Sequence, residues 1–463
     1  MTNGSRPSAW DSEHLALTVG SILAVTIIAF QGLALATIAP VLAEEIGGEA
    51  LYGWIFSAFL LPQMVGTVVA GQEVDRRSPA VIFLVFMLLF GAGLLVAGFA
   101  PNIGVLFVGR GLQGLGAGGM FSCVYAIINA AYEDQLRPMV LAALSSAWIV
   151  PSLIGPALAG FIAEQIGWRA VFFALLPLLV IVAPLTLPAY RRFEHPGGEA
   201  AIGAGRQRVT FSVVLALGSG LFLAGLQIRP WPLGLAAAVV GLALLAPTLW
   251  RLLPAGTFVA RPMLPAAIAA RGLFFAGFLV GETYMVRALK EFGDVSVTVA
   301  GVVVTAGSLS WTTGSWLQAR LDARTGTAGR PPRVVAGVSL MIAGIGLIFG
   351  DVLLTRDIAL PVAVAGWMTA GLGIGLAHAT CASIAFADTP PGQEGFVASS
   401  TLLWDLFTPA IGIGLGGAMI AIGTAGGLTI ELASAFALGL AVLLLLLAWA
   451  SAWRLRGGLM TEG

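Results

Sequence analysis

The segment GLGAGGMFSCVYAI, residues 114–127, has a degenerate second copy in GLGIGLAHATCASI, residues 371–384. Both copies are apolar and rich in glycine, and neither contains a charged residue. A second pair occurs in the same order, since GPALAG at 155–160 resembles TPAIGI at 408–413. Two such pairs indicate an internal repeat and therefore a chain built from two related halves.

The composition around this repeat is that of a membrane protein. Of the 463 residues, 58% are hydrophobic and 10% are charged, whereas a soluble protein carries about 25% charged residues. This shortage of charge excludes a soluble enzyme. The balance of 23 basic and 23 acidic residues gives no basic surface for nucleic acid. Because the apolar runs extend along the whole chain, we expect an all-α, polytopic membrane protein.

Apolar runs bounded by charged residues, proline or glycine predict fourteen transmembrane helices. They are expected near residues 15–42, 51–72, 80–100, 103–131, 138–163, 170–190, 209–228, 232–251, 264–287, 296–320, 334–354, 358–387, 396–423 and 431–453. The repeat then predicts an N-terminal six-helix bundle at 1–190, a cytoplasmic loop with two inserted helices at 191–252, and a C-terminal six-helix bundle at 253–463.

The distribution of cations predicts the orientation of these helices. Most arginines fall in loops on the side of the termini. The opposite loops hold Arg169, Arg229, Arg287, Lys290 and Arg356. By the positive-inside bias, both termini are expected to be cytoplasmic.

This orientation predicts the accessibility of the loop 197–205. Single cysteines introduced there should react with a membrane-impermeant maleimide only from the cytoplasmic side. Labelling of intact cells from outside would mean that the helix count before residue 191 is wrong by one.

Several motifs resemble those of the major facilitator superfamily, in particular its fourteen-helix drug:proton antiporter branch. After the second helix, Gly71, Asp75 and Arg76 fit the Gly-x-x-x-Asp-Arg loop motif, which in that family latches the two halves on the cytoplasmic side. In the fourth helix, Arg110 and Gln113 fit the Arg-x-x-Gln-Gly pattern, whose arginine is implicated there in proton coupling.

The fifth helix resembles that of exporters in the same family. Gly155, Pro156 and Gly160 fit the Gly-Pro-x-x-Gly-Gly motif, with Ala159 replacing one glycine. The first helix differs from the branch, which commonly carries an aspartate where this chain has Gln31. Because a glutamine cannot exchange a proton reversibly, coupling is expected to use other groups.

Glu282 is an ionisable residue inside a predicted span, and such residues are costly enough to indicate function. It lies about 18 residues after the cytoplasmic start of its helix, and therefore in the outer half of the membrane. We expect Glu282 to act in proton coupling or substrate binding, with pairing to Arg287 or to a nearby lipid headgroup as the structural alternative. Arg271 is about 16 Å from Glu282 along the same helix face. It is therefore expected to extend to the cytoplasmic boundary instead.

Asp405 and Arg110 are the other candidates for proton coupling. Asp405 falls near the membrane midplane, where it must face the protein interior. Coupling or cation recognition is expected, and a hydrogen bond that stabilises the kink at Pro409 is the alternative. For Arg110 the family resemblance implies coupling, whereas a structural salt bridge is the alternative.

A cavity between the halves is expected to bind the substrate. The residues predicted to line it are Gln31, Gln113, Trp148, His378 and Trp404. His378 has a suitable intrinsic pKa for proton exchange, although simple packing is its alternative role. Packing and interfacial anchoring are the alternatives for the tryptophans.

These features together predict a secondary exporter that moves small amphiphilic compounds outward while protons enter. The chain has no phosphate-binding loop and no pattern of metal ligands or catalytic nucleophiles, so no cofactor, metal or enzymatic activity is expected. We expect a monomer in the bacterial inner membrane. Export of a lipid or native metabolite is one alternative, and a non-transporting membrane sensor or scaffold is another.

Overall fold

The computed structural model of the chain describes residues 14–74, 76–133, 136–192, 202–228, 230–390 and 393–455, and these residues form helices without strands. The helices are α1 (Leu15–Ile46), α2 (Tyr52–Val74), α3 (Pro79–Gly98), α4 (Ile103–Ala131), α5 (Arg137–Ser146), α6 (Ile149–Gln165), α7 (Trp168–Phe173), α8 (Leu176–Tyr190), α9 (Ile202–Gly225), α10 (Trp231–Leu252), α11 (Leu264–Glu291), α12 (Val297–Thr325), α13 (Arg330–Thr355), α14 (Leu360–Ala387), α15 (Glu394–Ala425) and α16 (Ile430–Trp453). Short 3-10 turns are η1 (Glu49–Leu51), η3 (Thr257–Val259) and η4 (Thr327–Gly329).

The expected all-α membrane fold is confirmed. Within the described ranges, 13 helical segments are long and apolar enough to cross a membrane. The helix α6, with 17 residues, is apolar but shorter. Together these segments correspond to the fourteen predicted spans.

Two of the predicted helices are interrupted. The predicted span 138–163 divides into α5 and α6, and the span 170–190 divides into α7 and α8. In the first of these, Pro151 follows Ala147 by four residues and has no N–H to donate to its carbonyl. The hydroxyl of Thr26 on α1 donates to that carbonyl instead, at 3.2 Å. The break therefore leaves no unsatisfied carbonyl at Ala147, as the interior of a membrane requires.

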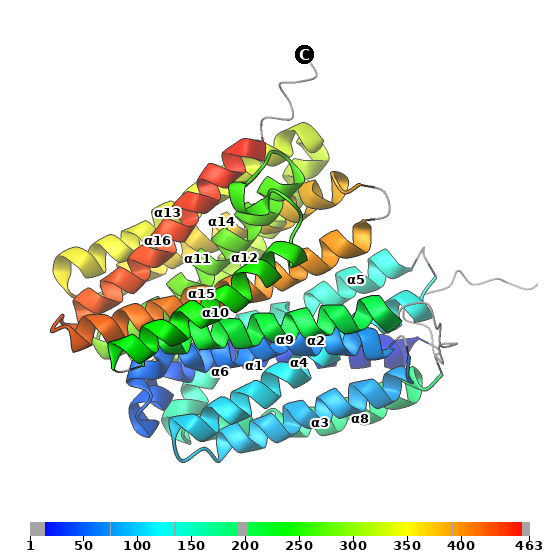
Figure 1. Cartoon of the computed structure of the whole chain (residues 1–463), viewed down its shortest axis with the longest axis horizontal. Helices are drawn as coiled ribbons and strands as arrows, with labels where there is room; N and C mark the ends of the chain where they lie inside the picture. The colour runs from blue at the N-terminus through cyan, green and yellow to red at the C-terminus, as the bar shows by residue number, and fades with distance from the viewer. Residues whose placement is uncertain are drawn as a thin grey trace, which may run out of the picture.

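The helices fall into two groups with a hairpin across their boundary (Figure 1). We call α1–α8 the N-terminal group and α11–α16 the C-terminal group. The helices α9 and α10 pack on one another, and α9 contacts both α2 and α15. A Cβ at Gly220 of α9 would lie 3.7 Å from the ring of Trp54 on α2, and Leu223 of α9 packs against Gly414 on α15. The inserted hairpin therefore covers the line along which α2 and α15 meet.

The repeated glycine segments allow close helix packing in both groups. In α4, a Cβ at Gly114 would lie 2.2 Å from the carbonyl oxygen of Phe59 on α2. In α14, a Cβ at Gly371 would lie 2.2 Å from the carbonyl oxygen of Gly307 on α12. Each segment thus lets the fourth long helix of its half approach the second at backbone distance, which only glycine permits.

Candidate functional site

A buried ion pair joins Arg271 and Asp405 in the C-terminal group. Arg271 lies about two turns into α11, and Asp405 lies about three turns into α15. The Arg271 Nη2 donates to Asp405 Oδ2 at 2.7 Å, and Nε lies 3.0 and 3.1 Å from the two carboxylate oxygens. The two side chains are only 11% and 14% exposed. The expectation that Arg271 extends to the membrane boundary is therefore wrong, because its charge is neutralised where it lies.

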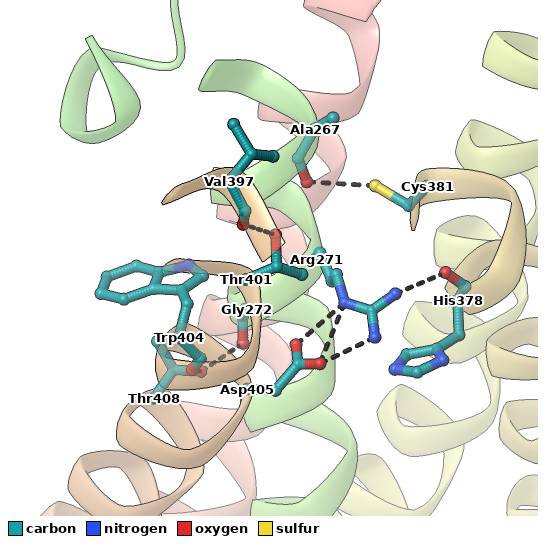
Figure 2. Close-up of polar contacts among 10 residues, drawn as sticks. All are labelled: Ala267, Arg271, Gly272, His378, Cys381, Val397, Thr401, Trp404, Asp405 and Thr408. Carbon is teal, nitrogen blue, oxygen red and sulfur yellow. Dashed lines mark hydrogen bonds and ion pairs between the residues drawn. The ribbon is translucent and has the colours of Figure 1, made fainter. Parts of the chain in front are cut away.

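Arg271 also reaches a third helix (Figure 2). Its Nη1 donates to the carbonyl oxygen of His378 on α14 at 2.9 Å. One guanidinium therefore connects α11, α14 and α15. Both oxygens of Asp405 accept from Arg271, so the carboxylate does not serve the turn at Pro409 that we considered as its alternative role. In that turn the Thr408 hydroxyl lies 2.8 Å from the carbonyl oxygen of Trp404.

Glu282 carries a buried carboxyl in α11. It is 6% exposed, and no hydrogen bond or ion pair reaches it from the residues that the structure describes. The alternative pairing with Arg287 does not form, because Arg287 donates to Glu291 at 2.6 Å. Unlike Asp405, Glu282 therefore has no cation in the described part of the chain to hold it in the charged form.

Aromatic rings lie along the α11 face that carries Arg271 and Glu282. Spacings of four, seven and eleven residues place Phe275, Phe278 and Glu282 on the face of Arg271. The ring of Phe275 is 5.4 Å from that of His378, and Phe278 is 5.4 Å from Trp311. The face thus carries two ionisable side chains, Arg271 and Glu282, and aromatic rings that pack against α14 and α12.

Arg110, Gln113 and Gln31 form one cluster in the N-terminal group. Arg110 Nη1 and Gln31 Nε2 both donate to Gln113 Oε1, the latter at 3.2 Å. Arg110 Nε donates to the carbonyl oxygen of Ile55 at 3.0 Å. All three side chains are at most 2% exposed. Among the described residues no carboxylate forms an ion pair with Arg110, so the alternative of a structural salt bridge is not realised.

The three remaining cavity candidates differ in position. Trp404 lies beside Asp405 in α15, stacked on Phe407 with ring centroids 5.7 Å apart. The buried Nε1 of Trp404 and Nε2 of His378 have no hydrogen-bond partner in the described chain. Trp148 is 45% exposed at the start of α6. Trp404 and His378 therefore flank the ion pair, whereas Trp148 is a partly exposed residue at the break between α5 and α6.

One residue of the predicted loop motif, Asp75, lies outside the described residues. Gly71 lies near the end of α2, where an added Cβ would be 3.2 Å from the hydroxyl of Ser122 on α4. Arg76 lies 3.7 Å from the carboxylate of Glu73. Glu73 also pairs with Arg77 at 2.9 Å, and this carboxylate is not part of the predicted motif.

The Gly-Pro motif builds a contact between the two groups of helices. A Cβ at Gly160 on α6 would lie 2.7 Å from the carbonyl oxygen of Val297 on α12. In return, a Cβ at Gly301 on α12 would lie 2.4 Å from the carbonyl oxygen of Pro156. Gly155 faces the ring of Phe30 on α1, with ordinary contact distances. The glycines at 160 and 301 thus allow two backbones from different groups to meet.

The carboxylate of Glu164 strengthens the same contact, and no motif in the sequence indicated this role. Its carboxylate accepts from the Thr298 backbone N–H at 2.9 Å and from the Thr298 hydroxyl at 2.6 Å. Thr298 lies in the first turn of α12, where unpaired N–H groups and the helix dipole favour an anion. A carboxylate of the N-terminal group therefore caps a helix of the C-terminal group.

Further contacts close the bundle at the end where η1 joins α1 to α2, which we call the η1 end. The Ser57 hydroxyl on α2 donates to the carbonyl oxygen of Ala410 on α15 at 2.7 Å. The guanidinium of Arg287 lies 4.7 Å above the ring of Tyr52. A cavity of about 580 Å³ opens at this end and includes Arg287 and Glu49 in its lining. It is a vestibule above the closed contacts and is separate from the ion pair.

A helical bundle in two groups, with charged residues buried inside each, is the architecture of a membrane transporter. The family model of the Major Facilitator Superfamily matches residues 21–412. The chain belongs to this family of transporters, and it is therefore a multi-pass membrane protein that acts on small molecules.

Two bacterial relatives carry names that describe efflux. The probable multidrug-efflux transporter Rv1634 of Mycobacterium tuberculosis is 27% identical over 399 residues, which cover 82% of each chain. The multidrug transporter protein MdtP of Bacillus subtilis is 27% identical over 170 residues, which cover 37% of this chain and 31% of that protein.

Solved structures of other transporters share the fold. An auto-inhibited POT family peptide transporter superposes with a TM-score of 0.70 at 16% identity, covering 95% of this chain and 96% of that one. A D-xylose–proton symporter gives 0.66 at 14% identity, covering 96% and 98%. At these identities the likeness concerns the fold alone.

Proposed function

We propose that this protein exports small amphiphilic compounds in exchange for protons. Its membership of the transporter family and the two relatives named for multidrug efflux support export. The observation that carries proton coupling is Glu282, a buried carboxyl that has no partner cation among the described residues. An ionisable side chain inside a membrane protein costs free energy of folding, so its presence indicates a function. The neutral, protonated carboxyl suits this environment better than the carboxylate does.

The proposed orientation places both termini in the cytoplasm of a bacterial cell, with the protein a monomer in the inner membrane. The η1 end then faces outward, and the contacts of Ser57 and Glu164 close the external side. In the proposed cycle the halves 1–190 and 253–463 rock against each other, while the hairpin of α9 and α10 covers their boundary. Breaking the external contacts would open the site to the outside.

In this cycle Glu282 takes up a proton from the outside and Asp405 passes it toward the cytoplasm. Arg110 supplies a fixed positive charge in the N-terminal half, held by Gln113 and Gln31. The substrate binds between the halves against the aromatic face of α11, with Trp404 and His378 at its inner end. Gln31, in place of a titratable aspartate, leaves proton exchange to the C-terminal half.

The loop motif is proposed to act as a conformational latch at the cytoplasmic side. Asp75→Asn should reduce the efflux rate several-fold and leave the amount of inserted protein unchanged, because the proposed latch acts between moving parts and does not support the fold of either half. Efflux assays in cells with quantified membrane expression would check this. A normal efflux rate in the variant would argue against the latch.

The proposed function is tested in everted membrane vesicles that contain the wild-type protein. Ethidium, a cation, and Nile red, a neutral compound, serve as fluorescent probes. The vesicles should accumulate at least one probe when the interior is acidified, and accumulation should stop on addition of an uncoupler. Vesicles without the protein are the control. Accumulation that ignores the uncoupler would overturn proton coupling.

A further inference from the structure

The Arg271–Asp405 pair is not explained by stability. Removing two charges from water costs several kcal/mol for each ion, and a buried ion pair is often no more stabilising than a well-packed apolar pair. The pair lies well inside α11 and α15, where the side chains remain 11% and 14% exposed. The pair is therefore mostly buried, but it is not completely enclosed by the protein.

The contacts of Arg271 are divided between two helices. Nε and Nη2 hold the carboxylate of Asp405 on α15, whereas Nη1 holds the carbonyl oxygen of His378 on α14. If Asp405 becomes neutral, the attraction between α11 and α15 weakens. The hydrogen bond from Arg271 to the carbonyl oxygen of His378 on α14 is kept. The guanidinium therefore has a second anchor that does not depend on the charge of Asp405.

The other titratable groups near Asp405 leave Arg271 as its partner. The carboxylate is surrounded by Arg271 on α11 and by Cys381 and His378 on α14. The thiol of Cys381 donates to the carbonyl oxygen of Ala267 at 3.1 Å and is thus occupied elsewhere. His378 reaches the pair through its backbone, and its ring packs 5.4 Å from that of Phe275. A proton or a ligand that binds Asp405 must compete with Arg271.

We propose that Arg271 is the positioning residue of the coupling step. Arg271 holds Asp405 in the ionised form until a proton binds the carboxylate and displaces the guanidinium. The guanidinium then stays hydrogen-bonded to the carbonyl oxygen of His378 on α14. This inference rests on the proposed proton-coupled export. Asp405 gains a proton at a carboxylate oxygen, the ion pair between α11 and α15 is lost, and the proton leaves again when Arg271 returns. The substrate does not occupy Asp405 in this scheme.

The experiment compares neutral and conservative variants in proteoliposomes that hold a pH-sensitive dye and are loaded with ethidium. In Arg271→Gln/Asp405→Asn two amides replace the ion pair, so the melting temperature should stay close to that of wild type. Protons moved per ethidium should nevertheless fall by roughly tenfold or more, within the usual range of coupling between sites.

The variant Arg271→Lys keeps the charge and therefore tests the proposal even if the double variant does not fold. A lysine cannot form the bidentate contact, so Asp405 is held less firmly in the charged form. The half-maximal pH of coupled transport should then move upward relative to wild type. A purely structural ion pair would change the melting temperature without moving the pH profile.

The outcomes separate the inference from the proposed function. If the double variant couples protons to ethidium as wild type does, the pair is structural and the inference is overturned alone. If Asp405→Asn weakens ethidium transport but leaves coupled Nile red transport unchanged, Asp405 recognises cations and the inference is again overturned. If wild-type protein moves ethidium without protons, the proposed function fails and the inference fails with it.

Discussion

Glu282→Gln is expected to abolish probe accumulation driven by a proton gradient while leaving probe binding within about twofold of wild type. The carboxyl has no partner among the described residues, so its replacement by an uncharged amide of similar size leaves no other group unpaired. Folding should therefore be unaffected. The loss of accumulation should exceed tenfold, as expected when an essential coupling interaction is removed.

The measurement combines ethidium accumulation in everted vesicles with ethidium binding to the purified variant. Glu431→Gln is the matched control, because Glu431 is a carboxyl in the first turn of α16 and has no role in the proposed path. The control should transport as wild type does. Full gradient-driven accumulation by Glu282→Gln would exclude this residue as the proton exchanger.

Gly160→Val is expected to reduce transport by about tenfold or more through steric exclusion at the contact between α6 and α12. A Cβ at this position would lie 2.7 Å from the carbonyl oxygen of Val297, and a β-branched side chain adds further bulk. The two groups of helices could then not close at the η1 end. Insertion in the membrane should be normal, because the interior of each group is unchanged.

A cysteine at position 57 provides the direct readout of this opening. Ser57 is fully buried between α2 and α15, so Ser57→Cys should be protected from an impermeant maleimide applied outside. Adding Gly160→Val should expose it. Gly346→Val is the control, since a Cβ on Gly346 in α13 meets nothing within 4 Å. Continued protection in the Gly160→Val background would contradict the proposed closure.

The helical fold and the repeat could be predicted because their causes are local. Long apolar runs specify spans, and the glycines at 114 and 371 specify where helices meet at backbone distance. The interruption at Trp148 was missed, because Pro151 lies inside an apolar run and the Thr26 hydroxyl that satisfies the freed carbonyl comes from α1.

The ion pair could not be predicted, because Arg271 and Asp405 are 134 residues apart and belong to different helices. Along α11 alone Arg271 has no carboxylate within reach. This favoured the incorrect prediction that its side chain extends to the cytoplasmic boundary of the membrane. The contact of Glu164 with Thr298 could not be predicted for the same reason. Pairing between helices depends on how they pack, and spacing along the chain does not report it.

The most direct test of proton-coupled export is a counter-transport measurement in proteoliposomes that contain only the wild-type protein. The vesicles are loaded with ethidium, the pH is equal on both sides, and the membrane potential is clamped. We predict that the outward flow of ethidium drives protons into the vesicles, so that the enclosed pH-sensitive dye reports acidification. Ethidium efflux without any change in internal pH would contradict the account.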